Sequence, residues 1–206
     1  MLVVTGPSGV GKGTLIRSLQ ERLPGLELSV SATTRPPRPG EVHGRDYWFL
    51  SAGEFDARMR AGDFLEHATY AGNRYGTLRS EVERVAAGAP RGGGDLIGRH
   101  PAVDDLKGLV LEIEIEGARQ IRRALPEAVQ VFIAPPSLDA LRSRLVGRGA
   151  DTPEQIEDRL AVAGRELAAR DEFRHVIVND RLENAVEELI ELVARVWGRP
   201  GKGARS

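Results

Sequence analysis

The chain has 206 residues, enough for one well-buried domain and too few for two full ones. Its 29 Lys and Arg nearly balance its 30 Asp and Glu, so no overall field draws it to nucleic acid or to an anionic membrane. Cysteine is absent, which excludes disulfides, cysteine-ligated zinc and a thiol nucleophile.

The first element is a short apolar strand, Leu2-Val3-Val4, followed by a glycine-rich turn and a helix over about 12–23. The turn has the composition and spacing of a phosphate-binding P-loop: Gly6, Pro7, Ser8, Gly9, Val10, Gly11, Lys12, Gly13 and Thr14. Glycines let backbone N–H groups converge on one anion, the helix N-terminus adds partial positive charge, and Lys12 reaches the β- and γ-phosphates. Position 13 is glycine where the standard pattern has Ser or Thr, so we assign Mg²⁺ ligation to Thr14. These residues predict a site for a nucleoside triphosphate with Mg²⁺.

Strands and helices alternate along the rest of the chain. We expect strands over 26–30, 47–50, 109–115, 130–134 and 175–178, and helices over 51–60, 117–124, 137–147, 153–170 and 181–197. Ser51 and Glu54 fit a capping box at the start of the second helix. This alternation behind an N-terminal P-loop predicts an α/β fold with a parallel sheet flanked by helices.

Two segments break the alternation. Residues 88–108 are rich in Gly and Pro and lack periodicity, which predicts a flexible surface loop, and residues 199–206 form a tail expected to fray. No apolar run approaches the roughly 20 residues of a membrane span, and the early first strand leaves no room for a signal peptide. We therefore expect a cytoplasmic protein with no membrane partner.

A second set of residues points to the acceptor of the phosphoryl group. Arg35 and Arg38 lie three apart in a segment stiffened by prolines, a fixed pair of guanidinium groups suited to a phosphate. Tyr47 and Tyr75 add phenol donors. Glu66 can accept two hydrogen bonds side by side, as the N1–H and exocyclic amine of guanine require. Each feature alone is weak, but their order behind a P-loop is specific.

These motifs closely resemble those of guanylate kinases, nucleoside monophosphate kinases that phosphorylate GMP. The resemblance runs through nearly the whole chain and is carried by the P-loop and by the segments 30–35, 39–41, 44–47, 62–66, 75–77, 135–137, 147–149 and 178–180. It implies that the GMP phosphate is held by Arg35, Arg38, Tyr47 and Tyr75. It also implies that Ser31, Glu66 and Thr77 read guanine, and that Asn179 and Asp180 line the adenine pocket of ATP.

Two features depart from the family pattern. The family usually ends this strand with Asp or Glu, then Ile or Val, then Asp, followed by an apolar residue, Gln and Gly. Here the segment reads Glu112-Ile113-Glu114-Ile115-Glu116-Gly117, so Glu114 takes the place of an aspartate that contacts GMP and Glu116 that of a glutamine. One extra methylene moves the carboxylate by about a bond length, so the site is either rearranged or reached from a shifted backbone. The 88–108 segment is longer than the turn expected there.

The resemblance also divides the chain, as one domain over 1–198. A P-loop core covers about 1–30, 108–136 and 165–198, a small mixed GMP-binding subdomain covers 31–87, the insertion covers 88–108, and a helical lid covers 137–164. Arg148 and Arg159 in the lid match the catalytic arginines of the family, with Lys12 and Arg38 completing the set. For Arg142, Arg144 and Arg165 a solvated helix face is at least as good an interpretation.

Two other functions remain open at this point. A kinase of the same fold could phosphorylate a sugar phosphate such as ribose 1,5-bisphosphate, although Ser31, Glu66 and Tyr75 argue against an acceptor with no base to read. A guanylate-kinase-like scaffold module could instead bind a partner peptide, although Lys12 and the P-loop argue against it. The oligomeric state, monomer or homo-oligomer, is not indicated.

Overall fold

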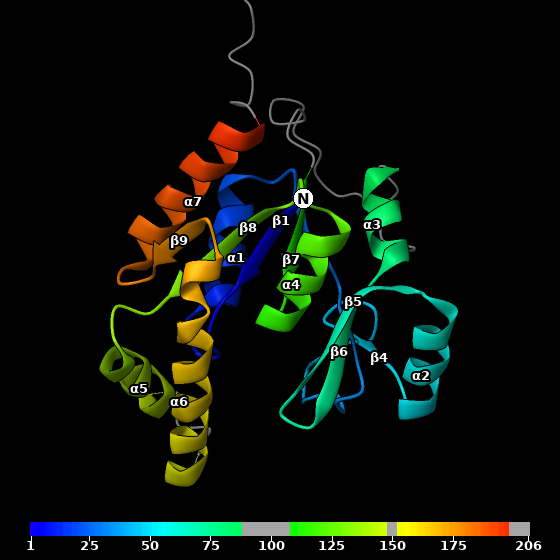
Figure 1. The fold of residues 1–206 in the computed structure, drawn as a ribbon, viewed down its shortest axis with the longest axis horizontal. Coiled ribbons are helices and arrows are strands. Elements are labelled where there is room, and N and C mark those ends of the chain that lie inside the picture. The colour runs from blue at the N-terminus through cyan, green and yellow to red at the C-terminus, as the bar shows by residue number, and fades with distance from the viewer. Residues whose placement is uncertain (88–107, 148–151, 198–206) are drawn as a thin grey trace, which may run out of the picture.

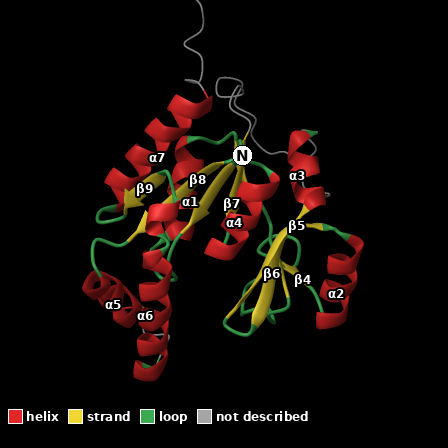
Figure 2. Ribbon diagram, viewed as in Figure 1, coloured by secondary structure: helices red, strands yellow, loops and turns green. Residues whose placement is uncertain are grey.

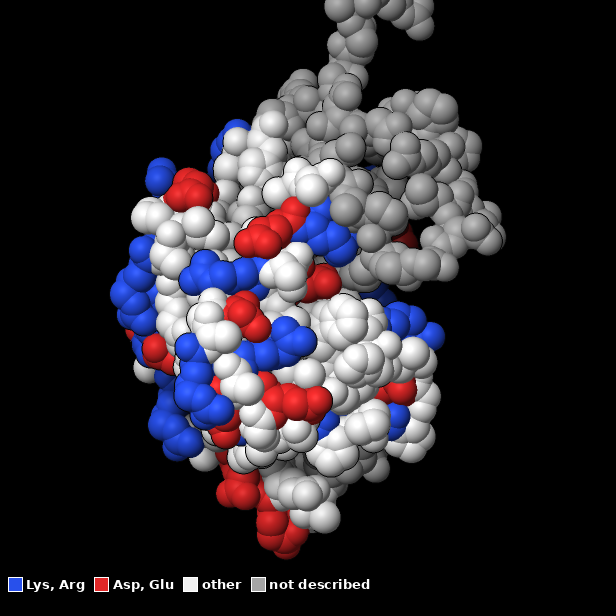
Figure 3. All heavy atoms as spheres, turned by 90° about the vertical axis from the view of Figure 1, so that its right-hand side faces the viewer, with Lys and Arg blue, Asp and Glu red and all other residues white. Residues whose placement is uncertain are grey.

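The computed structural model of the protein describes residues 1–87, 108–147 and 152–197 (Figure 1). Three features predicted from the sequence lie outside these residues: the insertion except for Gly108, the lid residue Arg148, and the frayed tail. No helix in the described part of the chain is both long and apolar enough to cross a membrane. Positive and negative side chains intermingle over the face shown in Figure 3, in keeping with the net charge of −1.

A five-stranded parallel sheet forms the centre of the molecule. Its strands lie in the order β2-β7-β1-β8-β9, and every neighbouring pair is parallel, which confirms the predicted sheet. Their bounds are β1 Leu2–Thr5, β2 Leu26–Leu28, β7 Gly108–Glu112, β8 Val129–Ala134 and β9 His175–Val178.

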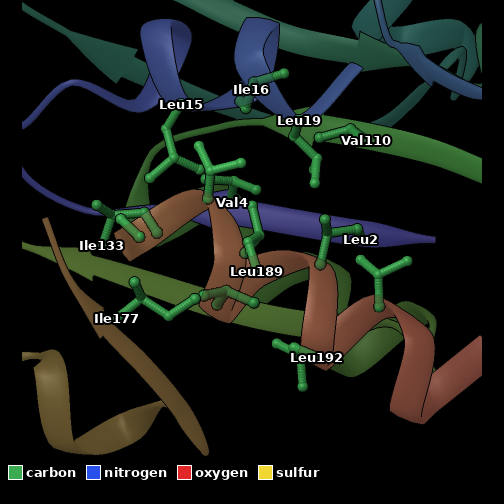
Figure 4. Close-up of a cluster of buried hydrophobic side chains, with 14 of the residues drawn as sticks. Leu2, Val4, Leu15, Ile16, Leu19, Val110, Ile133, Ile177, Leu189 and Leu192 are labelled. Atoms are coloured by element: carbon green, nitrogen blue, oxygen red, sulfur yellow. The ribbon is translucent and has the colours of Figure 1, made fainter. Parts of the chain in front are cut away.

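Helices cover both faces of this sheet because alternate strand residues point to opposite sides. Leu2 and Val4 pack with α1 (Lys12–Arg22) and α7 (Leu182–Trp197) in a fully apolar cluster (Figure 4). Val3 points the other way, into a second cluster that includes α4 (Ile115–Ala124).

A smaller mixed sheet stands beside the first, as Figure 2 shows. Its strands, in the order β4-β3-β6-β5, are β3 Ala32–Thr33, β4 Trp48–Phe49, β5 Phe64–Tyr70 and β6 Asn73–Leu78. Helix α2 (Ala52–Ala61) has the predicted capping box, in which Glu54 N donates to Ser51 Oγ at 3.2 Å and Ser51 N donates to Glu54 Oε2 at 2.7 Å. Helix α3 (Arg79–Ala86) leads out of β6. This lobe has its own apolar cluster of Ala32, Phe55, Phe64 and Leu78.

Two further helices, α5 (Leu138–Gly147) and α6 (Pro153–Ala168), lie side by side (Figure 1). They share a small cluster that includes Leu141, Leu145 and Ile156. An ion pair between Arg142 and Glu157 joins them on the outside. Helix α6 continues into a short 3₁₀ turn, η1 (Arg170–Glu172), before β9.

The structure corrects the prediction that a strand runs over 109–115. Strand β7 ends at Glu112, Glu114 is the extended N-cap residue of α4, and Ile115 is the first helical residue. Ile113 and Ile115 both pack into the cluster on that face, so the alternation continues across the junction although the strand does not. The predicted 26–30 strand likewise ends at Leu28, although Ser29 N still donates to Val110 O at 2.9 Å.

Candidate active site

The glycine-rich turn between β1 and α1 folds as a phosphate-binding loop. Gly6, Gly9 and Gly11 have φ values of 137°, 86° and 100°, in the region that side chains disfavour. A Cβ at Gly6 would also lie 2.2 Å from the carbonyl oxygen of Ile133 on β8. The sequence therefore needs glycine here both for the backbone angles and for the close approach to the sheet.

Lys12 lies across this loop and is 8% exposed. Its Nζ donates to the carbonyl oxygens of Gly6 at 2.6 Å and Pro7 at 3.2 Å. Backbone carbonyls thus hold the ammonium group against the loop, and a cation in this place suits the binding of a phosphate chain.

Two side chains from distant elements bond to the carbonyl of Val10 in the loop. Asn179 Nδ2 donates to Val10 O at 2.8 Å, and Arg144 Nη1 of α5 donates to it at 3.1 Å. Arg144 also donates to the Asn179 carbonyl at 2.6 Å and to the Asp180 carbonyl at 3.3 Å. Arg144 therefore is not part of a solvated helix face, whereas Arg142 pairs with Glu157 and Arg165 is exposed.

A cavity of about 440 Å³ opens between the P-loop and the smaller sheet. Of the predicted site residues, the cavity is lined by Ser8, Gly9, Gly11, Lys12, Gly13, Thr14, Ser31, Arg38, Tyr47, Glu66, Tyr75 and Glu114. The fold thus brings the predicted triphosphate and acceptor residues to one space, although Ser8 and Glu114 stand far apart in the chain.

Glu66 is the most buried carboxylate of the cavity, at 3% exposure. Thr77 Oγ1 donates to Glu66 Oε1 at 2.8 Å, and a Cβ at Gly117 of α4 would lie 2.2 Å from Glu66 Oε2. Burial raises the pKa of Glu66 from 4.5 to about 7, and nearby Glu114 acts in the same direction. Thr77 is fully buried and does not line the cavity, so in this structure it orients Glu66.

Arg35 and Arg38 differ in their surroundings. Arg35 pairs with Glu41 at 2.8 Å and lies over the ring of Tyr47 at 5.2 Å, and it does not line the cavity. Arg38 lines the cavity, and its backbone N–H donates to Glu41 Oε2 at 2.6 Å. The rings of Tyr47 and Tyr75 meet edge to face with centroids 6.2 Å apart. Burial raises the pKa of Tyr47, so this phenol stays a donor.

Three further carboxylates surround the P-loop side of the cavity. Glu112 and Glu114 line it, and Glu166 of α6 accepts a hydrogen bond from Ser8 N at 3.4 Å. Burial raises the pKa of Glu112, and burial together with Glu114 raises that of Glu166 to about 7. Glu114 Oε2 is buried and has no hydrogen-bond partner among the described residues. These acceptors suit a ligand that brings donors or cations.

The comparisons with known proteins agree with this geometry. The guanylate kinase family model matches residues 1–196. A guanylate kinase of Gloeobacter violaceus is 52% identical over 194 residues, covering 94% of this chain and 86% of that protein. One of Rubrobacter xylanophilus is 47% identical, covering 95% and 94%. The chain belongs to the guanylate kinase family.

A solved structure supports the fold assignment as well. The crystal structure of guanylate kinase from Anaplasma phagocytophilum superposes with a TM-score of 0.70 at 29% identity, covering 95% of this chain and 84% of that one. The chain is accordingly a kinase with the P-loop NTPase fold, as the resemblance implied.

Guanylate kinases use ATP with a divalent cation, and the described residues fit one at the P-loop. Thr14 is exposed beside Gly13, and its Oγ1 accepts from Arg17 Nη2 at 3.3 Å, which leaves a second lone pair. The position of a Cβ on Gly13 lies 3.4 Å from Glu112 Oε2, so a carboxylate is near as well. No group of three or more His, Cys, Asp or Glu within the described ranges could hold a metal ion by itself. Mg²⁺ bound with substrate phosphates takes only one or two protein ligands, and a hydroxyl such as that of Thr14 suits it.

The sequence analysis missed several residues of the candidate site. Arg17, Tyr70 and Glu112 line the cavity, and Glu166 contacts the P-loop. Arg17 could have been found, since it lies one helical turn after Gly13 on the same face. Tyr70 and Glu166 carried no sequence signal, because only the fold brings β5 and α6 to the P-loop.

Proposed function

We propose that this protein transfers the γ-phosphoryl group of ATP to the phosphate of GMP, giving ADP and GDP. One observation carries the proposal: the P-loop with Lys12 and the buried carboxylate Glu66 face the same cavity. The phosphate-binding loop accounts for the binding of ATP, the phosphoryl donor. A buried carboxylate, whose two oxygens accept hydrogen bonds side by side, accounts for the recognition of a guanine base. The acceptor is an intracellular nucleotide, which places the activity in purine metabolism of the cytoplasm.

The donor is held by the P-loop half of the cavity. Lys12 and the N–H groups of residues 8–14 bind the β- and γ-phosphates, and Asn179 and Asp180 border the adenine pocket. Thr14 supplies a hydroxyl oxygen to Mg²⁺, which neutralises charge on the phosphates when bound. We assign this half to about 1–30, 108–136 and 165–198.

The acceptor is held by residues 31–87 together with Glu114 from the 108–136 segment. Glu66 and Glu114 accept from guanine, Ser31 completes the base site while Thr77 holds Glu66 in place, and the GMP phosphate is bound by Arg35, Arg38, Tyr47 and Tyr75. Arg35 pairs with Glu41 and does not line the cavity, so its side chain moves when it binds the GMP phosphate.

The transfer needs placement and charge rather than covalent help from the protein. An oxygen of the GMP phosphate forms the new bond to the γ-phosphorus while the bond to the β–γ bridging oxygen breaks, and that oxygen leaves on ADP. The nucleophile is already an anion, so no general base is required. Arg38 from the acceptor side and Arg148 and Arg159 from the lid, about 137–164, neutralise the developing charge. These groups lie on separate segments, and closure brings them together and excludes water.

The test is ADP release from ATP and Mg²⁺ with GMP, AMP, UMP and ribose 1,5-bisphosphate offered separately. We expect release with GMP alone. Release with the sugar phosphate instead would remove Glu66 from the recognition of a base. No release with any acceptor, together with no ATP binding, would favour a peptide-binding module.

A further inference from the structure

Gln120 of α4 forms two hydrogen bonds with the backbone of a single residue of β5. His67 N donates to Gln120 Oε1 at 3.1 Å, and Gln120 Nε2 donates to His67 O at 2.7 Å. Strand β5 stands at the end of the order β4-β3-β6-β5, so the N–H and C=O groups of its alternate residues point away from β6. The amide of Gln120 pairs with one such residue in the way that a neighbouring strand would.

The pairing of β5 with β6 is irregular directly before this residue. Between Phe64 and Glu66 the chain of β5 advances by two residues while β6 advances by one, so Leu65 is extra in the ladder. A bulge of this kind turns the side chains near it and interrupts the hydrogen bonds between the strands. Glu66 therefore lies between a bulge and the residue that Gln120 holds, and the backbone on its C-terminal side is fixed from α4 as well as from β6.

The same face of α4 also approaches the carboxylate itself. Gly117 precedes Gln120 by three residues, so both lie on one side of the helix. A Cβ at Gly117 would lie 2.2 Å from Glu66 Oε2. Helix α4 and strand β5 thus lie side by side (Figure 1), with Gly117 leaving room for the carboxylate and Gln120 holding the backbone of the next residue.

Gln120 stands behind the base site and not in it. Neither Gln120 nor His67 lines the cavity, whereas Glu66 and Glu114 do. Glu114 is the N-cap residue of α4. Both carboxylates that are expected to accept from guanine are therefore placed relative to one helix, Glu114 because it begins that helix and Glu66 through Gln120.

We propose that Gln120 is a positioning residue for base recognition, which holds the His67 backbone so that both carboxylate oxygens of Glu66 meet the two donors of guanine. The proposal rests on the proposed function. Recognition of this kind needs the acceptor to be held within about 0.5 Å, which hydrogen bonds behind a site provide. IMP has the N1–H of GMP but lacks the exocyclic amine, so a fixed carboxylate distinguishes the two by a full hydrogen bond. A carboxylate that is free to shift follows the single donor of IMP better, and the preference for GMP falls.

The test uses the intact chain and two matched substitutions. Gln120→Met removes both hydrogen bonds and keeps the length of the side chain. Gln20→Met is the control, because the half-buried Gln20 of α1 likewise donates to a backbone carbonyl, that of Leu26 at 3.0 Å, in the half assigned to ATP. Steady-state assays with ATP and Mg²⁺ measure kcat/KM with GMP and with IMP, and the ratio of the two values is the base preference.

We expect Gln120→Met to lower the base preference by about threefold to tenfold, chiefly through a higher KM for GMP, and to leave the KM of ATP within about twofold of wild type. Gln20→Met should keep the wild-type preference. Gln120→Glu keeps an acceptor for His67 N and loses the donor to His67 O, so its preference should lie between those of the wild type and Gln120→Met. This variant also keeps the test available should Gln120→Met not fold.

A double substitution separates positioning from a general loss of structure. In Glu66→Gln the second oxygen no longer accepts from the amine, so adding Gln120→Met should change the base preference no further. The proposal is overturned by a further loss in this double variant, by an unchanged preference in Gln120→Met, or by an equal loss in Gln20→Met. A rise in the KM of ATP as large as that of GMP also overturns it.

The wild-type protein is assayed before any variant is compared. A wild type that uses IMP as well as GMP overturns the inference about Gln120 and leaves the GMP activity standing. A wild type that phosphorylates no GMP overturns the proposed function instead.

Discussion

Replacing Glu66 by Gln tests how the site reads its base. The substitution keeps an amide oxygen where Glu66 Oε1 accepts from Thr77 Oγ1, but it puts an NH₂ donor where the second carboxylate oxygen would face the donors of guanine. The variant loses a charge-assisted hydrogen bond to guanine and sets its own NH₂ donor against a donor of the base. Together these changes weaken GMP binding by about 3 kcal/mol, which is an increase of about 100-fold in Kd. We expect the KM of GMP to rise by this factor and the KM of ATP to stay within about twofold.

The same substitution carries a separate signature in stability. A buried carboxyl with its pKa raised from 4.5 to about 7 binds its proton more tightly in the folded than in the unfolded chain. The free energy of unfolding therefore falls as the pH rises between these values, by about 3 kcal/mol in total at about 1.4 kcal/mol per pH unit. The amide that replaces this carboxyl does not titrate. We thus expect Glu66→Gln to gain up to about 3 kcal/mol relative to wild type between about pH 4.5 and about pH 8.

Urea unfolding at about pH 4.5 and about pH 8, on either side of the titration, measures this difference without substrates. Glu21→Gln, which removes an exposed carboxylate on α1, controls for the loss of one charge. Equal increases in the two Michaelis constants would show that Glu66 does not read the base. A wild-type-minus-variant difference independent of pH would show that Glu66 is not a buried, proton-binding group.

Three other substitutions test other parts of the structure. Lys12→Ala should lower kcat by about 10³-fold or more, because the ammonium group that spans the P-loop is lost. A kcat near that of the wild type in steady-state assays would show that the loop has no part in the mechanism. Gly117→Ala should lower kcat/KM for GMP by about 10²-fold, because the added Cβ displaces Glu66. Gly53→Ala is the control: a Cβ there meets open space, so kcat/KM should stay unchanged. Ser51→Ala should lower the free energy of unfolding by about 1 kcal/mol through loss of the α2 capping box, and an unchanged urea midpoint would contradict that.

Elements with strong local signals were predictable from sequence. Three kinds of element depend on residues that are close in the chain: the P-loop strand with its helix, the strands that end at Ala134 and Val178, and the capping box at Ser51. The acceptor hairpin was not predicted, because polar residues interrupt the apolar pattern of β5: Glu66 faces the cavity and Thr69 is exposed. A functional strand departs from alternation for this reason.

The candidate site divides in the same way. Lys12, Glu66 and Tyr75 stand in motifs, and the structure places them in one cavity. Glu166 sits in a polar stretch of α6, and nothing in that stretch indicates its contact with Ser8, 158 residues away. The role of Arg144 depends on three backbone carbonyls that carry no sequence signal at all.

The separate apolar cluster of the smaller sheet has a consequence for how such proteins diversify. Ala32, Phe55, Phe64 and Leu78 pack with one another and share no member with the clusters of the parallel sheet. Mutations within this cluster can then accumulate without unpacking the parallel sheet, whereas Leu65, Val82 and Val85 of the same lobe pack against the second cluster of that sheet. A chimaera carrying another kinase's residues 31–87 would bring its own small core and a new acceptor specificity. It would also need matching side chains where Leu65, Val82 and Val85 meet the parallel sheet.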